Sequence, residues 1–217
     1  MKEEMINSLT EKYRPCKIEE MVGQSHITMK ILEYRKHDNL PHLLFYGRAG
    51  RGKTTLALLI SDLFNCDFLE LNASDKRGID TVRERIRTFA RYKPFMADFK
   101  LLLLDEADSM TQEAQNMLRR IMEKYARNCR FIICCNDLNK IIEPIQSRCT
   151  RFKFSDIPER EIFERLRFIN SMEKRGLCNS DIEEISRKCH GDLRRGINDL
   201  QGYTSKPKNE YDEIFMR

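Results

Sequence analysis

A glycine-rich segment around residue 50 has the residue types and the spacing that bind phosphate. Residues 47–54 read G-x-x-x-x-G-K-T, after the apolar run 43–46 and before a helix-like run at 56–64. The N–H groups of such a loop turn inward around phosphate oxygens, Lys53 reaches the outer phosphates, and Thr54 offers a hydroxyl to Mg²⁺. These flanking elements make a chance glycine-rich turn the less favoured interpretation. The segment predicts a nucleoside-triphosphate site on a strand, a loop and a helix.

Two further strand-like runs end in polar side chains that such a site needs. The apolar run 101–104 ends in Asp105 and Glu106, and the run 131–135 ends in Asn136. Asp105 can hold Mg²⁺, usually through water, and Glu106 can polarise a water for attack on the γ-phosphate. Asn136 can position that water or contact the γ-phosphate, because ligands of open α/β sheets lie at the carboxyl ends of the strands. An incidental acidic cap on a buried strand is the less favoured alternative.

Strand-like and helix-like segments alternate up to about residue 155, and only helix patterns follow residue 158. The alternation predicts an α/β fold with a parallel sheet between helices. We therefore expect an ATP-binding domain over residues 1–155 and a small all-helical lid domain over residues 156–217.

Three local signals predict how individual segments begin or end. Thr111 is expected to cap the helix that follows it. Ser180 and Glu183 have the spacing of a capping box for a helix in the lid. Residues 11–15 are polar and end in a proline, which favours an extended arm over a helix.

Composition excludes several classes of protein. Hydrophobic residues make up 41% and charged residues 34% of the 217, and no apolar run approaches the roughly 18 residues of a membrane helix. The N-terminus lacks the apolar core of a secretion signal, so we expect an intracellular protein with no membrane partner. The eight cysteines form no C-x-x-C pair. Free thiols in a reducing compartment explain them better than disulfides or zinc sites.

The positive charge is concentrated in one segment. The net charge is +5 over the whole chain, and residues 76–93 alone hold seven basic and two acidic residues. Arg83, Arg87 and Arg91 recur every four residues on the flank of a predicted helix. Their step of about 6 Å is comparable with the spacing of phosphates along a DNA strand. From this pattern alone, a DNA contact and a solvated basic face are equally favoured.

Seven motifs along the chain carry a resemblance to one family. The sequence resembles the small subunits of replication factor C, the sliding-clamp loader of eukaryotes and archaea, within the AAA+ ATPases. The motifs are EKYRP (11–15), LPHLLFYG-x-x-G-x-GKTT (40–55), ELNASDKRGID (70–80), LLLLDEADSMT (101–111), AQNMLRRIME (114–123), KIIEPIQSRCTRFKF (140–154) and GDLRRGINDLQ (191–201). The triplet Ser147-Arg148-Cys149 sets clamp loaders apart from most AAA+ relatives. The resemblance implies a P-loop AAA+ domain followed by a helical lid.

The resemblance also implies which positions hold ATP and Mg²⁺. Tyr13, Arg14 and Val22 are expected on the adenine side of the nucleotide. The residues expected around its phosphates are Gly47, Gly50, Arg51, Gly52, Lys53, Thr54, Thr55, Asn136 as the first sensor and Arg194 as the second. Thr54 and Asp105 are the expected ligands of Mg²⁺.

The residues that the resemblance assigns to hydrolysis are Lys53, Glu106, Asn136 and Arg148. Arg148 resembles the arginine finger, which in this family enters the ATP site of the neighbouring subunit rather than its own. An arginine finger can be worth roughly 10³ or more in rate. An isolated chain is therefore expected to be a poor ATPase.

The partners that the resemblance implies are the other subunits of a hetero-pentamer, the ring-shaped sliding clamp and primer–template DNA. Arg83 and Arg87 resemble residues that follow the template backbone, through contacts that would be independent of sequence and sensitive to salt. Residues 91–96 occupy the region that touches the clamp in this family, although Phe95 is also compatible with a core position. The expected location is the nucleus if the source is eukaryotic and the cytoplasm otherwise.

The sequence departs from the family pattern at three places. Arg48 and Ala49 stand where the loop usually has two prolines, and Arg51 replaces a threonine or a similar small residue, so two added positive charges are expected beside the phosphates. Leu9 takes the place of a tryptophan before the EKYRP arm. Family members continue into a helical collar domain of ordinary domain size, so this sequence, which stops at Arg217, is expected to be either a fragment with the ATPase and the lid or an unusually reduced subunit.

Two functions of other classes remain as alternatives. Residues 105–108 read D-E-A-D, the signature of RNA helicases that need two tandem ATPase domains, and 217 residues with a helical tail cannot hold the second. The other alternative is an assembly subunit that binds nucleotide without turnover. The presence of Lys53, Glu106 and Asn136 argues against it.

Overall fold

The computed structural model describes residues 8–74 and 79–203, with the side chains of residues 79–83 excepted. Within these ranges the chain forms two compact units. The larger unit comprises residues 15–155, and the smaller one combines residues 8–14 with residues 156–203.

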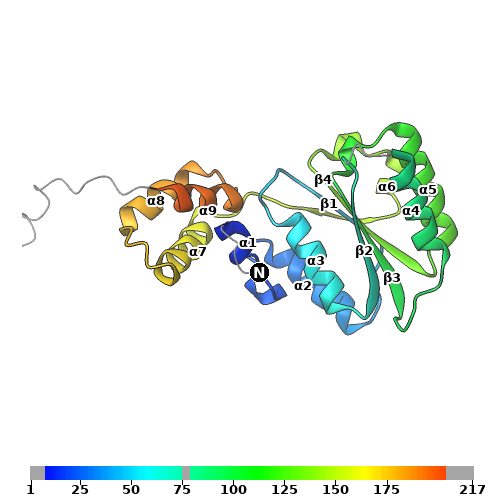
Figure 1. Cartoon of the computed structure of the whole chain (residues 1–217), viewed down its shortest axis with the longest axis horizontal. Helices are drawn as coiled ribbons and strands as arrows, with labels where there is room; N and C mark the ends of the chain where they lie inside the picture. Colours follow the sequence, from blue (N-terminus) through cyan, green and yellow to red (C-terminus); the bar gives the residue numbers. More distant parts are fainter. Residues whose placement is uncertain (1–7, 75–78, 204–217) are drawn as a thin grey trace, which may run out of the picture. The chain divides into compact units, whose positions relative to one another are not determined.

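The larger unit is built on a parallel sheet of five strands in the order β2-β3-β4-β1-β5 (Figure 1). The strands are β1 (Leu43–Tyr46), β2 (Cys66–Asn72), β3 (Phe99–Asp105), β4 (Cys129–Cys135) and β5 (Thr150–Lys153). The first strand lies between β4 and β5, so the carboxyl ends of β1, β3 and β4 meet at one edge. The predicted α/β fold with a parallel sheet is confirmed.

Both faces of this sheet are covered by helices, which explains why its central strands are continuously apolar. Leu101 and Leu103 of β3 pack with α2 (Ser25–Lys36) and α3 (Lys53–Leu63). Leu102 and Leu104 point the opposite way, into a second core with the other helices. Successive side chains of a strand alternate between faces, and a fully buried leucine stabilises a fold by about 1.5–3 kcal/mol.

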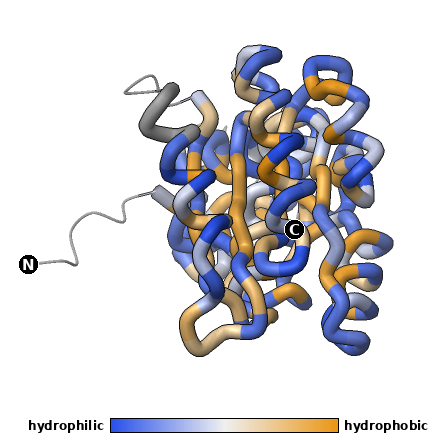
Figure 2. The backbone as a smooth tube through the Cα atoms, turned by 90° about the vertical axis from the view of Figure 1, so that its right-hand side faces the viewer, coloured by the Kyte–Doolittle hydropathy of each residue, from blue (hydrophilic) through white to orange (hydrophobic). Residues whose placement is uncertain are grey.

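The helices of the second face are α4 (Ile79–Arg91), α5 (Gln112–Tyr125) and the short α6 (Glu143–Gln146) (Figure 1). Three 3₁₀ turns, η1 (Ile18–Glu20), η2 (Ala107–Ser109) and η3 (Leu138–Lys140), complete this unit. Figure 2 shows strands as orange hydrophobic stretches, whereas the helices change between blue and orange along each turn. That change is the mark of helices with one buried face. The hydroxyl of Thr111 accepts a hydrogen bond from the Ala114 N–H at 3.3 Å, so the predicted cap of α5 is confirmed.

The smaller unit contains helices only. They are α1 (Leu9–Lys12), α7 (Glu159–Met172), α8 (Asn179–Lys188) and α9 (Leu193–Gly202). Leu166 and Ile182 are fully buried among these helices, and the Leu9 N–H donates to the Gln201 Oε1 at 2.9 Å. The unit thus includes residues 8–14, which were expected in the ATP-binding domain. The functional division into an ATP-binding domain and a lid stays a prediction.

Two local expectations in this unit were wrong. Residues 11–15 were expected to be extended, but Glu11 and Lys12 lie in α1, which the buried Leu9 anchors. Proline restricts only the residue directly before it, so Pro15 leaves Lys12 free to be helical.

The predicted capping box of Ser180 and Glu183 is displaced by two residues. Helix α8 begins at Asn179, its N-cap is Cys178, and the Asp181 Oδ2 accepts from the Cys178 N–H at 3.3 Å. Cysteine is not among the residues favoured at the N-cap, so the start of α8 could not be recognised from the sequence.

All eight cysteines are free thiols. Burial raises the pKa of the Cys129 and Cys149 thiols to about 12. Among the described residues, no group of histidine, cysteine and acidic side chains has the arrangement of a metal site, and no helix has the length and apolar character to cross a membrane.

Candidate nucleotide site

The glycine loop has a backbone conformation that only glycine adopts easily. Gly47, Gly50 and Gly52 have φ angles of +143°, +72° and +91°. A Cβ added to Gly47 would lie 2.3 Å from the carbonyl oxygen of Phe154, so this position has neither the space nor the backbone angle for a side chain. Gly52 is the N-cap of α3. The loop therefore places the N-terminus of α3 at the edge where β1 ends.

Lys53, the first residue of α3, is held at this edge by three acceptors. Its Nζ donates to the carbonyl oxygens of Gly47 at 2.6 Å and Arg48 at 3.0 Å, and to the Asn136 Oδ1 at 2.9 Å. The side chain is buried, and burial lowers the pKa of its ammonium group, while the nearby Asp105 acts in the opposite direction. An ammonium group has three N–H donors. All three therefore have an acceptor before any ligand arrives.

Thr54 connects the same helix to the end of β3. Its hydroxyl donates to the Asp105 Oδ2 at 2.6 Å, and the Asp105 Oδ1 accepts from the Glu106 N–H at 2.8 Å. Hydroxyl and carboxylate oxygens are the hard ligands that Mg²⁺ takes, so the donor set fits this ion. Thr55 follows in the first turn of α3 and is half-buried. The four residues Lys53, Thr54, Asp105 and Asn136 are called the Lys53 cluster below.

Glu106 stands at the same edge in an unusual backbone conformation. Its φ is +53°, in the left-handed region that costs a residue other than glycine of order 1–3 kcal/mol. The Ser109 hydroxyl and N–H donate to its carbonyl oxygen at 2.7 and 2.9 Å. The side chain is exposed and has room to approach a ligand beside Asp105.

The two added arginines of the loop behave differently from each other. Arg51 is 3% exposed and folds back on the loop, where its Nη1 donates to the Ala49 carbonyl oxygen at 3.5 Å. Arg48 is exposed. The placement of both charges beside the phosphates, and the nucleotide contact of Arg51, stay predictions.

Sequence reasoning did not single out Asn72, which ends β2 at the same edge of the sheet. Asn72 is paired in register with Asp105 of β3, and its Oδ1 accepts from the N–H and the hydroxyl of Ser74, both at 2.8 Å. The sequence could have indicated Asn72, because it is a polar residue at the end of a predicted strand, as Asp105 and Asn136 are.

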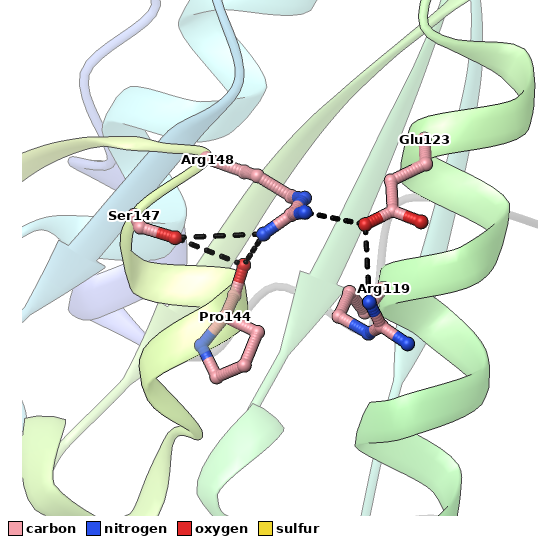
Figure 3. A network of polar contacts seen from close by, with 5 residues as sticks. All are labelled: Arg119, Glu123, Pro144, Ser147 and Arg148. Atoms are coloured by element: carbon pink, nitrogen blue, oxygen red, sulfur yellow. Dashed lines mark hydrogen bonds and ion pairs between the residues drawn. The ribbon is translucent and has the colours of Figure 1, made fainter.

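Arg148 follows the short α6 and lies in a separate set of contacts (Figure 3). Its Nη1 donates to the Pro144 carbonyl oxygen at 2.6 Å and lies 3.5 Å from the Ser147 Oγ, and its Nη2 lies 2.5 Å from the Glu123 Oε1. The same carboxylate oxygen pairs with the Arg119 Nη1 at 3.2 Å. These five residues, called the Arg148 network below, do not include the glycine loop.

Comparison with known proteins decides the family. The model of the ATPase family associated with various cellular activities (AAA) matches residues 43–157. The replication factor C small subunit of Methanococcus maripaludis is 47% identical over 213 residues, which are 95% of this chain and 68% of that protein. This chain belongs to the replication factor C small subunit family of AAA ATPases.

Other members of the family are similarly close. The replication factor C small subunits of Thermofilum pendens and Methanoculleus marisnigri are 47% and 48% identical, over 94% and 88% of this chain. The chain covers 65% and 62% of those two relatives, slightly less than two thirds of their length. The RuvB Holliday junction branch migration motor of Thermotoga maritima, at 17% identity, has the same fold with a TM-score of 0.73 over 87% of this chain.

The replication factor C resemblance also assigned nucleotide contacts to residues of the smaller unit. The Tyr13 hydroxyl donates to the Glu173 Oε1 at 2.5 Å, and its ring packs edge-on against Phe168 of α7. Arg14 forms an ion pair with Glu11 at 2.6 Å.

Arg194 is exposed in the first turn of α9, whereas Val22 belongs to the larger unit and is half-buried. The nucleotide contacts of Tyr13, Arg14, Val22 and Arg194 stay predictions.

The predicted DNA contacts lie on α4. Arg87 is exposed there, and the side chain of Arg83 lies outside the described residues. After the helix, Tyr92, Phe95 and Met96 are 61%, 81% and 88% exposed. Phe95 is therefore not a core residue, which removes one alternative for the segment that the resemblance assigns to the clamp.

Proposed function

We propose that this chain is an ATP-hydrolysing subunit of a DNA sliding-clamp loader. The observation that carries the proposal is the Lys53 cluster, in which Lys53 and Thr54 at the start of α3 are hydrogen-bonded to Asn136 and Asp105 at the ends of β4 and β3. One edge of the sheet thus joins a phosphate-binding cation, a hydroxyl, a carboxylate and an amide. Membership in a family of AAA ATPases supports the same conclusion.

In this proposal, ATP binds with its phosphates in the glycine loop. Lys53 and the loop N–H groups bind phosphate oxygens, and Arg194 is a further proposed contact of the nucleotide. Thr54 and Asp105 would hold Mg²⁺, which neutralises charge on the phosphates when it is bound.

The remaining groups complete the site. Glu106 polarises the attacking water, and Asn136 orients it. Tyr13, Arg14 and Val22 contact the adenine side of the nucleotide. Each of these roles follows from matching this sequence to the family motif.

The work of the nucleotide is to change the assembly. Arg148 completes the ATP site of the adjoining subunit, so ATP favours the arrangement in which subunits stack with their sites at the interfaces. That arrangement opens the ring-shaped clamp and grips primer–template DNA through Arg83 and Arg87, and hydrolysis releases the clamp. The proposed location is where DNA is replicated, in the nucleus of a eukaryote or the cytoplasm of an archaeon.

The first test concerns the ATP site itself. Lys53→Ala should weaken ATP binding at least about tenfold, because the phosphates lose a charge-assisted hydrogen-bond donor. The measurement is equilibrium binding of a fluorescent ATP analogue, with Lys36→Ala as the control, because Lys36 is an exposed lysine of α2 outside the loop. Equal affinities for wild type and Lys53→Ala would contradict the proposed site.

The second test concerns the task. The protein should be isolated from its own cells at moderate salt, and its companions identified by mass spectrometry. Related ATPase subunits and a ring clamp are expected. If the protein is recovered only with RNA-processing factors, the fold still stands but the proposed clamp-loading role is contradicted. In the recovered complex, Glu106→Gln should reduce ATP turnover, and unchanged turnover would favour a subunit that binds nucleotide without hydrolysing it.

A further inference from the structure

The guanidinium group of Arg148 is fixed from two sides. Its Nη1 donates at 2.6 Å to the carbonyl oxygen of Pro144 in the preceding short helix α6, and its Nη2 lies 2.5 Å from the Glu123 Oε1 on α5 (Figure 3). Arginine is planar and carries five N–H donors in a rigid fork. Two anchored nitrogens stop the plane from turning and leave other N–H groups, including that of Nε, for a further anion.

Glu123 is itself held in place. Arg119 lies one turn earlier on α5, and its Nη1 pairs with the same Oε1 at 3.2 Å. The carboxylate therefore has an arginine on either side, and its side chain is 39% exposed. Exposed ion pairs of this kind add little to stability, so the geometry of the network calls for another explanation.

We infer that Glu123 is a positioning residue for Arg148, which keeps its guanidinium group oriented toward a phosphate of the adjoining subunit. This inference rests on the proposed function, in which Arg148 acts in trans. Pro144 alone fixes one nitrogen, and a group anchored at one point still rotates. Glu123 supplies the second anchor, and Arg119 keeps that anchor in place.

The inference is tested in the assembled complex by measuring kcat and KM for ATP with DNA present. Glu123→Ala should lower kcat roughly five- to tenfold, the factor that ordering one side chain rich in rotamers is worth. KM for ATP should not change, since the chain's own site is intact. Glu123→Gln keeps an oxygen that accepts from Nη2 and should stay within about twofold of wild type.

A control for general loss of an ion pair is available in the same unit. Glu33 pairs with Lys30 at 2.7 Å on the exposed side of α2, and Glu33→Ala should leave kcat unchanged. Glu123→Ala and Glu33→Ala should have similar thermal unfolding midpoints, so that a fall in kcat with Glu123→Ala reports positioning rather than unfolding.

A double mutant separates action through Arg148 from any other role. Glu123→Ala combined with Arg148→Ala should be no slower than Arg148→Ala alone, because there is no longer a guanidinium group to position. If Glu123→Ala slows turnover by the same factor with and without the Arg148→Ala change, the inference is overturned. If Arg148→Ala slows turnover but Glu123→Ala leaves it at or above the wild-type rate, the inference fails and the proposed function stands. If Arg148→Ala has no effect, the trans role fails as well.

Discussion

The Lys53 cluster and the Arg148 network both hold a cation with oxygen acceptors, but different parts of the protein supply those oxygens. Lys53 is buried, and two of its three acceptors are carbonyl oxygens of its own loop. Arg148 is 36% exposed and depends on a carboxylate from another helix. The first arrangement is fixed by the backbone, and the second is made of side chains that water and salt reach. The residues of the Lys53 cluster thus hold one another within a single chain, while the side chain of Arg148 stays accessible to solvent.

The largest expected effect tests the exposed Arg148 network. Arg148→Ala should leave the ATP affinity of the mutated chain nearly unchanged and slow hydrolysis at the adjoining site by roughly 10³. The free energy of unfolding should change by less than about 1 kcal/mol, since the ion pair is exposed. Nucleotide titration of the isolated chain and single-turnover hydrolysis by the complex measure the two parts. A parallel loss of ATP affinity would contradict action in trans.

The next effect tests whether the buried site depends on its backbone. Gly47→Ala forces a Cβ to within 2.3 Å of the Phe154 carbonyl oxygen at a φ of +143°, so the free energy of unfolding should fall by about 3 kcal/mol. Gly176→Ala is the matched control, because Gly176 has a φ of +73° but no atom within 4 Å of the added Cβ. Its loss should be about 1–2 kcal/mol, the cost of the backbone angle alone.

Chemical denaturation of the two variants gives both values, and ATP titration of Gly47→Ala shows whether the loop keeps its function. Losses of equal size would mean that the close approach of Gly47 to Phe154, directly after β5, is relieved by local movement and does not shape the loop.

Much of the nucleotide site was predicted from the sequence because its parts are local. The glycine loop and the polar residues after the apolar runs are read within a few positions of one another, and a parallel sheet brings such strand ends together. The pairing of Arg148 with Glu123 could not be predicted in this way, because it joins residues 25 positions apart, one on α5 and one in the turn after α6. The burial of Arg51 was missed for a related reason, since charge at a loop position does not reveal which way the side chain turns.

The smallest expected effect extends the comparison to the other end of the sheet and to pH. His42 precedes β1, and its Nδ1 accepts from the Phe131 N–H at 3.2 Å. Burial, together with the charge of Arg130, lowers the pKa of this imidazole from 6.5 to about 4. The unfolded chain therefore takes up a proton between pH 6.5 and 4 while the folded chain does not, and stability falls over this range as pH falls, by at most about 3 kcal/mol.

Unfolding measured at a series of pH values tests this expectation. His42→Asn is the matched variant, because an amide oxygen can accept the same hydrogen bond without titrating. The slope of stability between pH 4 and 6.5 should be smaller in that variant than in wild type. Identical slopes would assign the pH dependence to carboxylates elsewhere.

The burial of Lys53 and Arg51 has a consequence for proteolysis. Trypsin cleaves after lysine and arginine, and the loop offers Arg48, Arg51 and Lys53 within six residues. The last two are only 3% and 8% exposed, and Lys53 is hydrogen-bonded to the carbonyl oxygens of the loop itself. A protease binds its substrate as an extended strand. The loop therefore resists cleavage at these sites as long as Lys53 keeps its hydrogen bonds to the loop carbonyl oxygens. Cutting at Arg51 or Lys53 would then report how often the loop opens.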